Sequence, residues 1–182
     1  MRGSLFLQAT PYVIAASFLA IAFLHWRLKS TGFQMISWKA IVIASGMSWG
    51  VFAAVLISSA WDSYYRYFMP GWYRYLAPVA AVVLYPALGL LFHRAAMHLP
   101  GSPILWFCFL GGVESIPEHA VAIYRFEILQ IPLLVGAHAA AVFLFAFFEY
   151  MFYWSVVLAL AAVFSGLLRL SSQLVRSSQP DR

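Results

Sequence analysis

Long apolar stretches separated by short polar or aromatic segments make up most of this 182-residue chain. A helix needs about 20 mainly apolar residues to cross the hydrocarbon core of a bilayer. On this basis we expect spans over residues 5–26, 40–60, 76–92 and 104–124. The stretch 128–168 is apolar almost throughout, so we expect it to form either one long helix or two shorter ones.

This last stretch leaves the number of spans open at five or six. Glu149 and Tyr150 could form a tight turn between two helices, which gives six spans. Alternatively, residues 127–130 form an extramembrane or re-entrant piece before one long helix, which gives five. The Lys and Arg positions favour five, because a basic first loop and a basic tail then face the same side of the membrane.

The composition agrees with the apolar pattern, since 64% of the residues are hydrophobic and 9% are charged. Soluble domains carry about 25% charged residues. The sequence therefore predicts one integral membrane domain over residues 1–182, an all-α polytopic transmembrane helix bundle whose main partner is the lipid bilayer. We expect it in the bacterial inner membrane. Its basic residues are scattered near predicted helix ends, which suits membrane topology, and we expect no nucleic-acid partner.

Four of the six acidic residues are glutamates within one apolar region. An ionisable side chain at bilayer depth costs at least ~2.5 kcal/mol on insertion scales, so it marks a candidate functional site. Glu114 and Glu118 are four residues apart and share a helix face. Two carboxylates that close cannot both ionise cheaply, so one carries a proton or a cation lies between them. Pro117 can kink the helix there, and His119 follows at once.

Glu127, His138 and Glu149 are spaced eleven residues apart. Eleven residues are close to three helical turns, so on one continuous helix these three side chains would form a polar stripe. Such a stripe should face the interior of the bundle. A turn at Glu149 would remove it.

Glutamate and histidine on neighbouring helices can bind iron, zinc or manganese. We therefore predict a metal site, with iron or zinc as the cofactor, although the Glu-x-x-His and His-Glu-x-x-His spacings do not occur. The predicted ligands are Glu114, Glu118, His119 and His138, with Glu127 and Glu149 as further candidates. The leading hypothesis is a metal-dependent oxidoreductase or hydroxylase that acts on a lipophilic substrate, and whether the protein is an enzyme is left open.

The histidines allow a different cofactor. His25 and His93 each end an odd-numbered predicted helix and so should lie near one membrane surface, while His119 and His138 should lie near the other. Two levels of paired histidines are what a bundle with two b-type haems needs. The first alternative is thus an electron-transfer subunit that binds haem b or another pigment.

Two further alternatives use the same polar residues without a cofactor. The glutamates could move protons or ions across the membrane. They could also form hydrogen bonds between helices in a non-catalytic subunit of a larger complex, with other membrane subunits as partners.

An aromatic and basic segment over residues 64–75 alternates tyrosines with arginines. Arg66, Trp72 and Arg74 suit the lipid headgroup region, and we predict contact with lipid there. The single cysteine, Cys108, rules out an internal disulfide and a metal site built from several cysteines. Phosphate-binding loops and Ser-His-Asp patterns are absent from the sequence.

Overall fold

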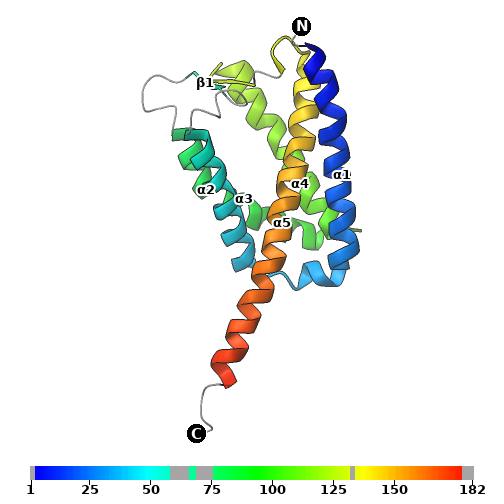
Figure 1. Ribbon diagram of the computed structural model, residues 1–182, viewed down its shortest axis with the longest axis vertical. Coiled ribbons are helices and arrows are strands. Elements are labelled where there is room, and N and C mark those ends of the chain that lie inside the picture. Colours follow the sequence, from blue (N-terminus) through cyan, green and yellow to red (C-terminus); the bar gives the residue numbers. More distant parts are fainter. Residues whose placement is uncertain (1–2, 58–65, 69–75, 132–133, 178–182) are drawn as a thin grey trace.

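A computed structural model describes residues 3–57, 66–68, 76–131 and 134–177 (Figure 1). Within these ranges the chain is mainly helical, with one short antiparallel strand pair and short connecting segments, so the expected all-α class is confirmed. The elements in chain order are α1 (Gly3–Gln34), α2 (Trp38–Ile57), β1 (Arg66–Tyr67), α3 (Leu76–His98), α4 (Pro103–His119), the π-helix η3 (Ala120–Arg125), β2 (Leu129–Gln130) and α5 (Ala139–Ser177).

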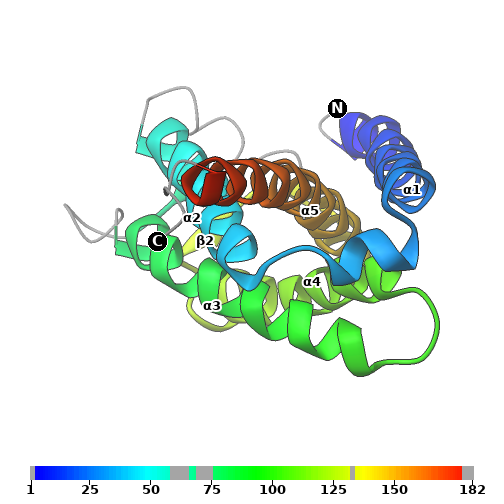
Figure 2. The same ribbon diagram turned by 90° about the horizontal axis from the view of Figure 1, so that it is seen from below.

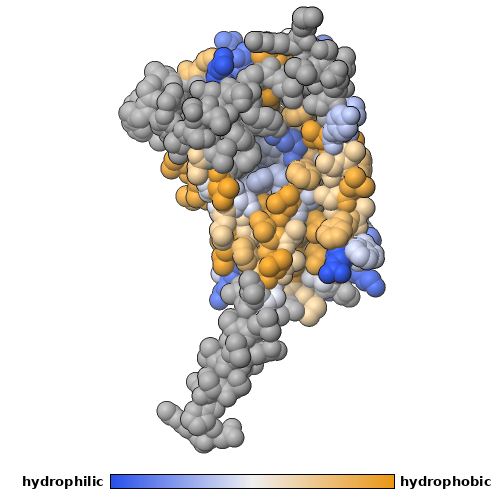
Figure 3. Space-filling view, in the orientation of Figure 1, coloured by the Kyte–Doolittle hydropathy of each residue, from blue (hydrophilic) through white to orange (hydrophobic). Residues whose placement is uncertain are grey.

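Three of the described helices contain segments long and apolar enough to cross a membrane. These segments are Thr10–Lys29, Val79–His98 and Ala139–Gly166. Figure 3 shows an apolar belt on one face of the molecule with more polar residues toward both ends of the belt. These features agree with a membrane protein, but they do not confirm a count of five or six spans. The helix α4, for example, has 17 residues before the π-helix begins.

The structure corrects two predictions for the last third of the chain. The turn at Glu149 is wrong, because α5 runs without a break through 39 residues and begins at Ala139. The polar stripe is wrong as well. Glu127 has a φ of 54° and lies outside every described helix. His138 lies just before the first residue of α5. The alternative with a non-helical piece around residues 127–130 before one long helix agrees with the observed strand β2.

Helix boundaries differ elsewhere by smaller amounts. The helix α1 extends past the predicted end at residue 26, but it contains a break at Lys29, where φ is 51° and ψ is 178°. The helix α3 continues to His98, six residues beyond its predicted end. Such extensions are expected, because hydropathy marks the apolar part of a helix and says little about its polar ends.

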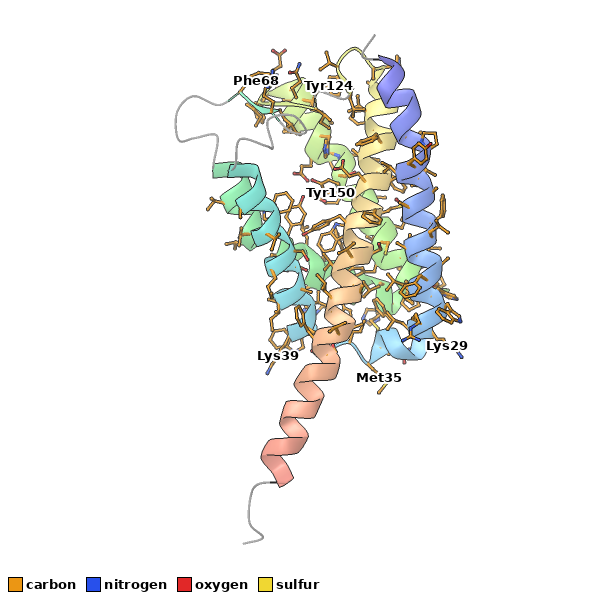
Figure 4. All side chains as sticks on the ribbon, viewed as in Figure 1. Lys29, Met35, Lys39, Phe68, Tyr124 and Tyr150 are labelled. Carbon is orange, nitrogen blue, oxygen red and sulfur yellow. The ribbon has the colours of Figure 1, made fainter. Side chains whose placement is uncertain are left out.

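The strand pair joins two connections that are distant in sequence. Arg66 pairs with Gln130 and Tyr67 with Leu129, and the Phe68 amide donates to the Ile128 carbonyl at 2.9 Å. The α2–α3 connection is thereby fastened to the α4–α5 connection. Figure 4 shows Phe68 and Tyr124 at this end of the bundle, with Lys29 and Lys39 at the other end.

The loop before α4 follows the turn signal in Pro100-Gly101-Ser102-Pro103. Gly101 has a φ of 92°, which a side chain would disfavour. The Ser102 hydroxyl accepts a hydrogen bond from the Leu105 amide and so caps the helix. Pro103 occupies the first turn, where its missing N–H costs nothing.

The long helix α5 is the central element of the bundle, with α1 and α2 on either side of it and α4 beneath it in Figure 2. Two hydrogen bonds that involve serine hydroxyl groups connect α5 to α1 and to the segment just before α2. The Ser17 hydroxyl of α1 lies 2.6 Å from the Phe148 carbonyl, to which it can donate. The Ser165 hydroxyl of α5 accepts from the Ser37 amide at 3.0 Å, just before α2 begins.

The indole of Trp154 fixes the distance between α5 and its neighbours α3 and α4. It is fully buried, and a Cβ placed on Gly111 of α4 would overlap its ring. A Cβ on Gly89 of α3 would also press on the same ring, at 3.1 Å. Phe92 and Phe107 contact it edge-on, with centroids at 5.0 and 5.6 Å. The two glycines therefore allow close helix packing around one large side chain.

We expect Gly111→Ala to destabilise the protein by about 1–3 kcal/mol, because the added methyl group overlaps the Trp154 ring. The measurement is the thermal unfolding midpoint of purified protein in detergent. Gly50→Ala in α2 is the matched control, since nothing lies within 4 Å of a Cβ there. An equal midpoint for the two variants would contradict the packing assigned to Trp154.

Candidate functional site

Side chains from three helices form a hydrogen-bonded chain in the bundle interior. The Tyr85 hydroxyl of α3 lies 3.1 Å from Glu118 Oε2 of α4 and 2.8 Å from the Tyr150 hydroxyl of α5. A phenol has one hydrogen, so Tyr85 donates to one neighbour and accepts from the other. Figure 4 shows Tyr150 between the two ends of the bundle, well away from Lys39 and Phe68.

Glu114 extends this chain by one member. Its carboxyl group lies one helical turn from that of Glu118, so the two groups interact and can share a hydrogen bond when one of them holds a proton. A hydrogen bond between two carboxyl groups needs a proton, since two carboxylates would repel each other. We call Glu114, Glu118, Tyr85 and Tyr150 the carboxyl–tyrosine network.

The position of Tyr85 is fixed from both sides of its ring. Trp49 stacks on it with a centroid distance of 4.2 Å and an interplanar angle of 12°. Trp154 lies parallel to it at 5.8 Å and 8°. The phenol is 1% exposed, so burial and two parallel indoles hold its hydroxyl between the helices.

The backbone changes from α-helix to π-helix next to the network. Pro117 lies inside α4 and cannot donate the usual backbone hydrogen bond. The π-helix η3 begins two residues after Glu118. Single turns of π-helix often occur at functional sites. His119 is buried at this junction, and its Nδ1 donates to the Ser115 carbonyl at 2.8 Å. Its ring meets that of Tyr150 edge-on at 5.4 Å.

A cavity of about 750 Å³ opens on the side of the bundle between α1 and α2, with α5 as its floor. We call it the lateral groove. Its lining is mostly aliphatic and aromatic, and it consists of Tyr12, Val13, Ala16, Met47, Ser48, Trp49, Val51, Glu149, Tyr150, Phe152, Tyr153, Val156, Leu160 and Phe164.

The lateral groove and the carboxyl–tyrosine network share Tyr150. This residue lines the groove and also bonds to Tyr85, which bonds to Glu118. Ser48 lines the same groove, and its hydroxyl oxygen is buried without a hydrogen-bond partner among the described residues. The groove thus has a mainly apolar wall that includes two hydroxyl-bearing residues, and apolar cavities with a few polar groups are common sites for small lipophilic molecules.

The structure brings together only some of the predicted metal ligands. Glu114, Glu118 and His119 lie on the same helix end, and the two carboxyl groups interact electrostatically. His138 is exposed, and its ring Nδ1 accepts from the Ala140 amide at the start of α5. Across the described ranges, no group of three or more His, Cys, Asp or Glu side chains is arranged to hold a metal ion. The metal site stays a prediction.

The two further candidate metal ligands, Glu127 and Glu149, lie in different parts of the molecule. Glu127 is exposed and lines a smaller cavity of about 420 Å³ beside the strand pair. Glu149 is half-buried in the first third of α5 and lines the lateral groove.

The histidines of the haem hypothesis have different surroundings. His25 is exposed and contacts the Ser102 hydroxyl at 3.3 Å. His93 is buried and stacks on Phe33 with a centroid distance of 5.1 Å. His119 is buried, whereas His138 is exposed at a helix start. None of these contacts tests haem binding, which stays a prediction.

Of the residues predicted to contact lipid, Arg66 is exposed on β1. Trp72 and Arg74 lie outside the described residues.

The sequence analysis missed the tyrosines of the site. Tyr85 lies within an apolar run, and only one of the two alternatives for the last apolar stretch places Tyr150 in a turn. The available signal was their position, because tyrosines favour the ends of spans and both lie well inside predicted apolar segments. Tyr153 and Trp154 carry the same signal in α5.

No protein-family model, curated protein sequence or solved structure matches this chain. Its function must therefore be argued from the site itself.

We expect Tyr85→Phe to lower stability by about 1–3 kcal/mol, because Glu118 and Tyr150 both lose a buried partner. Thermal unfolding in detergent measures the change. Tyr124→Phe, at a half-exposed position on η3, is the control and should leave the midpoint unchanged. Equal midpoints for both variants would show that the network contributes nothing to stability.

Proposed function

We propose that this protein is an integral membrane protein that binds a lipophilic molecule in the lateral groove and exchanges a proton with its polar group. The observation that carries the proposal is the double role of Tyr150, which lines the groove and is hydrogen-bonded through Tyr85 to Glu118. An apolar cavity with a few convergent polar groups is the usual form of a small-molecule site.

The chemistry of the network is proton transfer along hydrogen bonds. When the carboxyl pair gives a proton to Tyr85, the phenol passes its own proton to Tyr150, and Tyr150 passes its proton to the ligand. The pair loses one proton, that proton neutralises negative charge that has formed on the ligand's polar group, and both phenols end neutral with their hydrogen bonds reversed. Transfer in the opposite direction uses the same contacts. Buried carboxyl and phenol groups are common general acids and bases.

We propose the bacterial inner membrane as its location. The apolar helices support a bilayer environment. Lys29 and Lys39 lie at one end of the bundle (Figure 4), and we assign this end to the cytoplasm.

The test of groove binding is the amount of lipophilic ligand that co-purifies with the protein. We expect Val156→Trp to remove it, because Val156 lines the groove and an indole would fill part of the cavity. Val163→Trp is the matched control on the same helix, since Val163 is 59% exposed and does not line the groove. Solvent extraction followed by mass spectrometry gives the ligand content of each variant.

A lipophilic species bound near one per protein in the parent and in Val163→Trp, but lost in Val156→Trp, supports the proposal. Equal lipid content in all three proteins, with both variants folded, would sink it. The extracted species also provides the ligand for the next measurement.

Infrared spectroscopy tests the proton step. We expect a protonated carboxyl band in the parent protein that shifts when the extracted ligand is added to ligand-free protein. Tyr85→Phe should bind the ligand without this shift, because the connection between Tyr150 and Glu118 is cut. A shift of the same size in Tyr85→Phe would show that the carboxyl band does not respond to the ligand through Tyr85, and so would contradict the proposed connection between the network and the groove.

A metal ion at the carboxyl pair is the second candidate, and one observation favours it. Glu114 Oε2 is buried without a hydrogen-bond partner among the described residues. A cation there would neutralise the negative charge of both glutamates. His119 is the nearest additional candidate metal ligand in the sequence. The metal would then supply the oxidoreductase or hydroxylase chemistry expected from the sequence.

Elemental analysis by mass spectrometry separates the two candidates. A resident metal predicts near-stoichiometric iron or zinc in the parent and its loss in Glu114→Gln. The proton-transfer proposal predicts the same low metal content in both proteins, together with loss of the carboxyl band in the variant.

A further inference from the structure

The composition of the lateral groove limits the kind of molecule that fits it, if the proposed binding function holds. We propose that the ligand is an uncharged, long-chain lipid with a hydroxyl or carbonyl headgroup, which enters sideways from the bilayer between α1 and α2.

The first argument is the charge of the groove. Among the described residues that line it there is no Lys, Arg or His, and the one ionisable acid is Glu149. Behind Tyr150 lies the carboxyl pair of the network. An anionic headgroup would meet acidic groups and find no cation to compensate its lost hydration.

A cationic headgroup is disfavoured for a different reason. Glu149 is the acid that would have to balance the charge, and it already takes part in another interaction. The cation would have to displace that interaction and lose its own hydration in an apolar cavity. An uncharged headgroup avoids both costs.

The second argument is the hydrogen-bonding capacity of the groove. Ser48 Oγ is buried in its wall with no partner among the described residues, and each such group costs free energy until it is satisfied. Tyr150 lines the floor of the groove, on α5. Ser48 Oγ lies just beneath the groove surface, so a hydroxyl or carbonyl headgroup bonds to it after rotation of the Ser48 side chain toward the groove, and a hydroxyl also reaches the network through Tyr150.

The third argument is the length and lining of the groove. Its floor extends along α5 from Glu149 to Phe164, a distance of about 22 Å at 1.5 Å per residue. This is a large part of the hydrocarbon core, which is about 30 Å thick. Aromatic side chains such as Phe152 and Phe164 line it, so an extended hydrocarbon chain would contact apolar groups along its length.

The sideways opening follows from the arrangement of the helices. The two walls of the groove come from α1 and α2, which lie on either side of α5 in Figure 2. Val51 of α2 is exposed at 67% and lies on the groove. At bilayer depth this opening faces lipid chains, so a lipid can enter without crossing water.

Three photoreactive probes test the headgroup. They carry the same isoprenoid chain and an alcohol, a carboxylate or an ammonium group, and each is added to the full-length protein in lipid nanodiscs. Mass spectrometry of the irradiated protein locates and counts the labelled residues. We expect the alcohol probe to label groove residues at least about ten-fold more than either charged probe, because burying an uncompensated charge costs over ~1.4 kcal/mol.

Two variants make the result specific to this groove. Val156→Trp should abolish groove labelling by the alcohol probe, whereas Val163→Trp should not. Ser48→Ala should weaken labelling by the alcohol probe by about five-fold, the effect of one lost hydrogen bond.

The outcomes separate this inference from the function on which it rests. Groove labelling led by the carboxylate or ammonium probe overturns the uncharged headgroup and leaves groove binding intact. Labelling by the alcohol probe that Ser48→Ala leaves unchanged overturns the role of Ser48. Equal labelling of groove and outer surface by all probes, with no ligand lost in Val156→Trp, overturns both the inference and the proposed function.

Discussion

The placement of one large indole between two glycines is the constraint on which the rest of this bundle depends. Trp154 of α5 fills the space that Gly89 of α3 and Gly111 of α4 leave open. Bilayer lipid is as apolar as a leucine side chain, so helices associate through close packing and polar contacts more than through the hydrophobic effect. Trp154 also forms one wall of the stack around Tyr85. The contact that holds the helices together therefore also positions the hydroxyl at the centre of the site.

The carboxyl–tyrosine network is the polar counterpart of that packing. Buried polar groups are costly in an apolar interior unless their partners are in place. The contacts from Tyr85 to Glu118 and to Tyr150 join α3, α4 and α5 at one level. The aromatic packing supplies rigidity, and the hydrogen bonds restrict the helices to one register. The lateral groove lies against this centre, with walls from α1 and α2 and with Tyr150 of the network in its floor.

The helical class and the carboxyl pair could be predicted from the sequence because both depend on local patterns. Apolar runs of sufficient length identify helices, and a spacing of four places Glu114 and Glu118 on one face. The break before α5 could not be located in the same way. The segment around Glu127 is apolar on both sides, and its conformation follows from pairing with β1, a contact between distant parts of the chain.

The tyrosines of the network were missed for a related reason. A tyrosine in an apolar run can face lipid, pack in the core or bond to a carboxyl group, and helical periodicity does not distinguish these cases. Only the crossing of α3, α4 and α5 brings Tyr85 and Tyr150 together with Glu118. The predicted polar stripe of Glu127, His138 and Glu149 was wrong because it required one continuous helix. The chain instead leaves the helical conformation before Glu127, and α5 begins only after His138.

The length of α5 has a mechanical consequence. With 39 residues it is about 58 Å long, roughly twice the thickness of the hydrocarbon core. Figure 1 shows its last turns extending beyond the other helices. The same rod is the floor of the lateral groove. The protruding end and the groove floor are therefore parts of one continuous helix, so the position of the floor relative to α1 and α2 is tied to the position of the segment beyond the bundle.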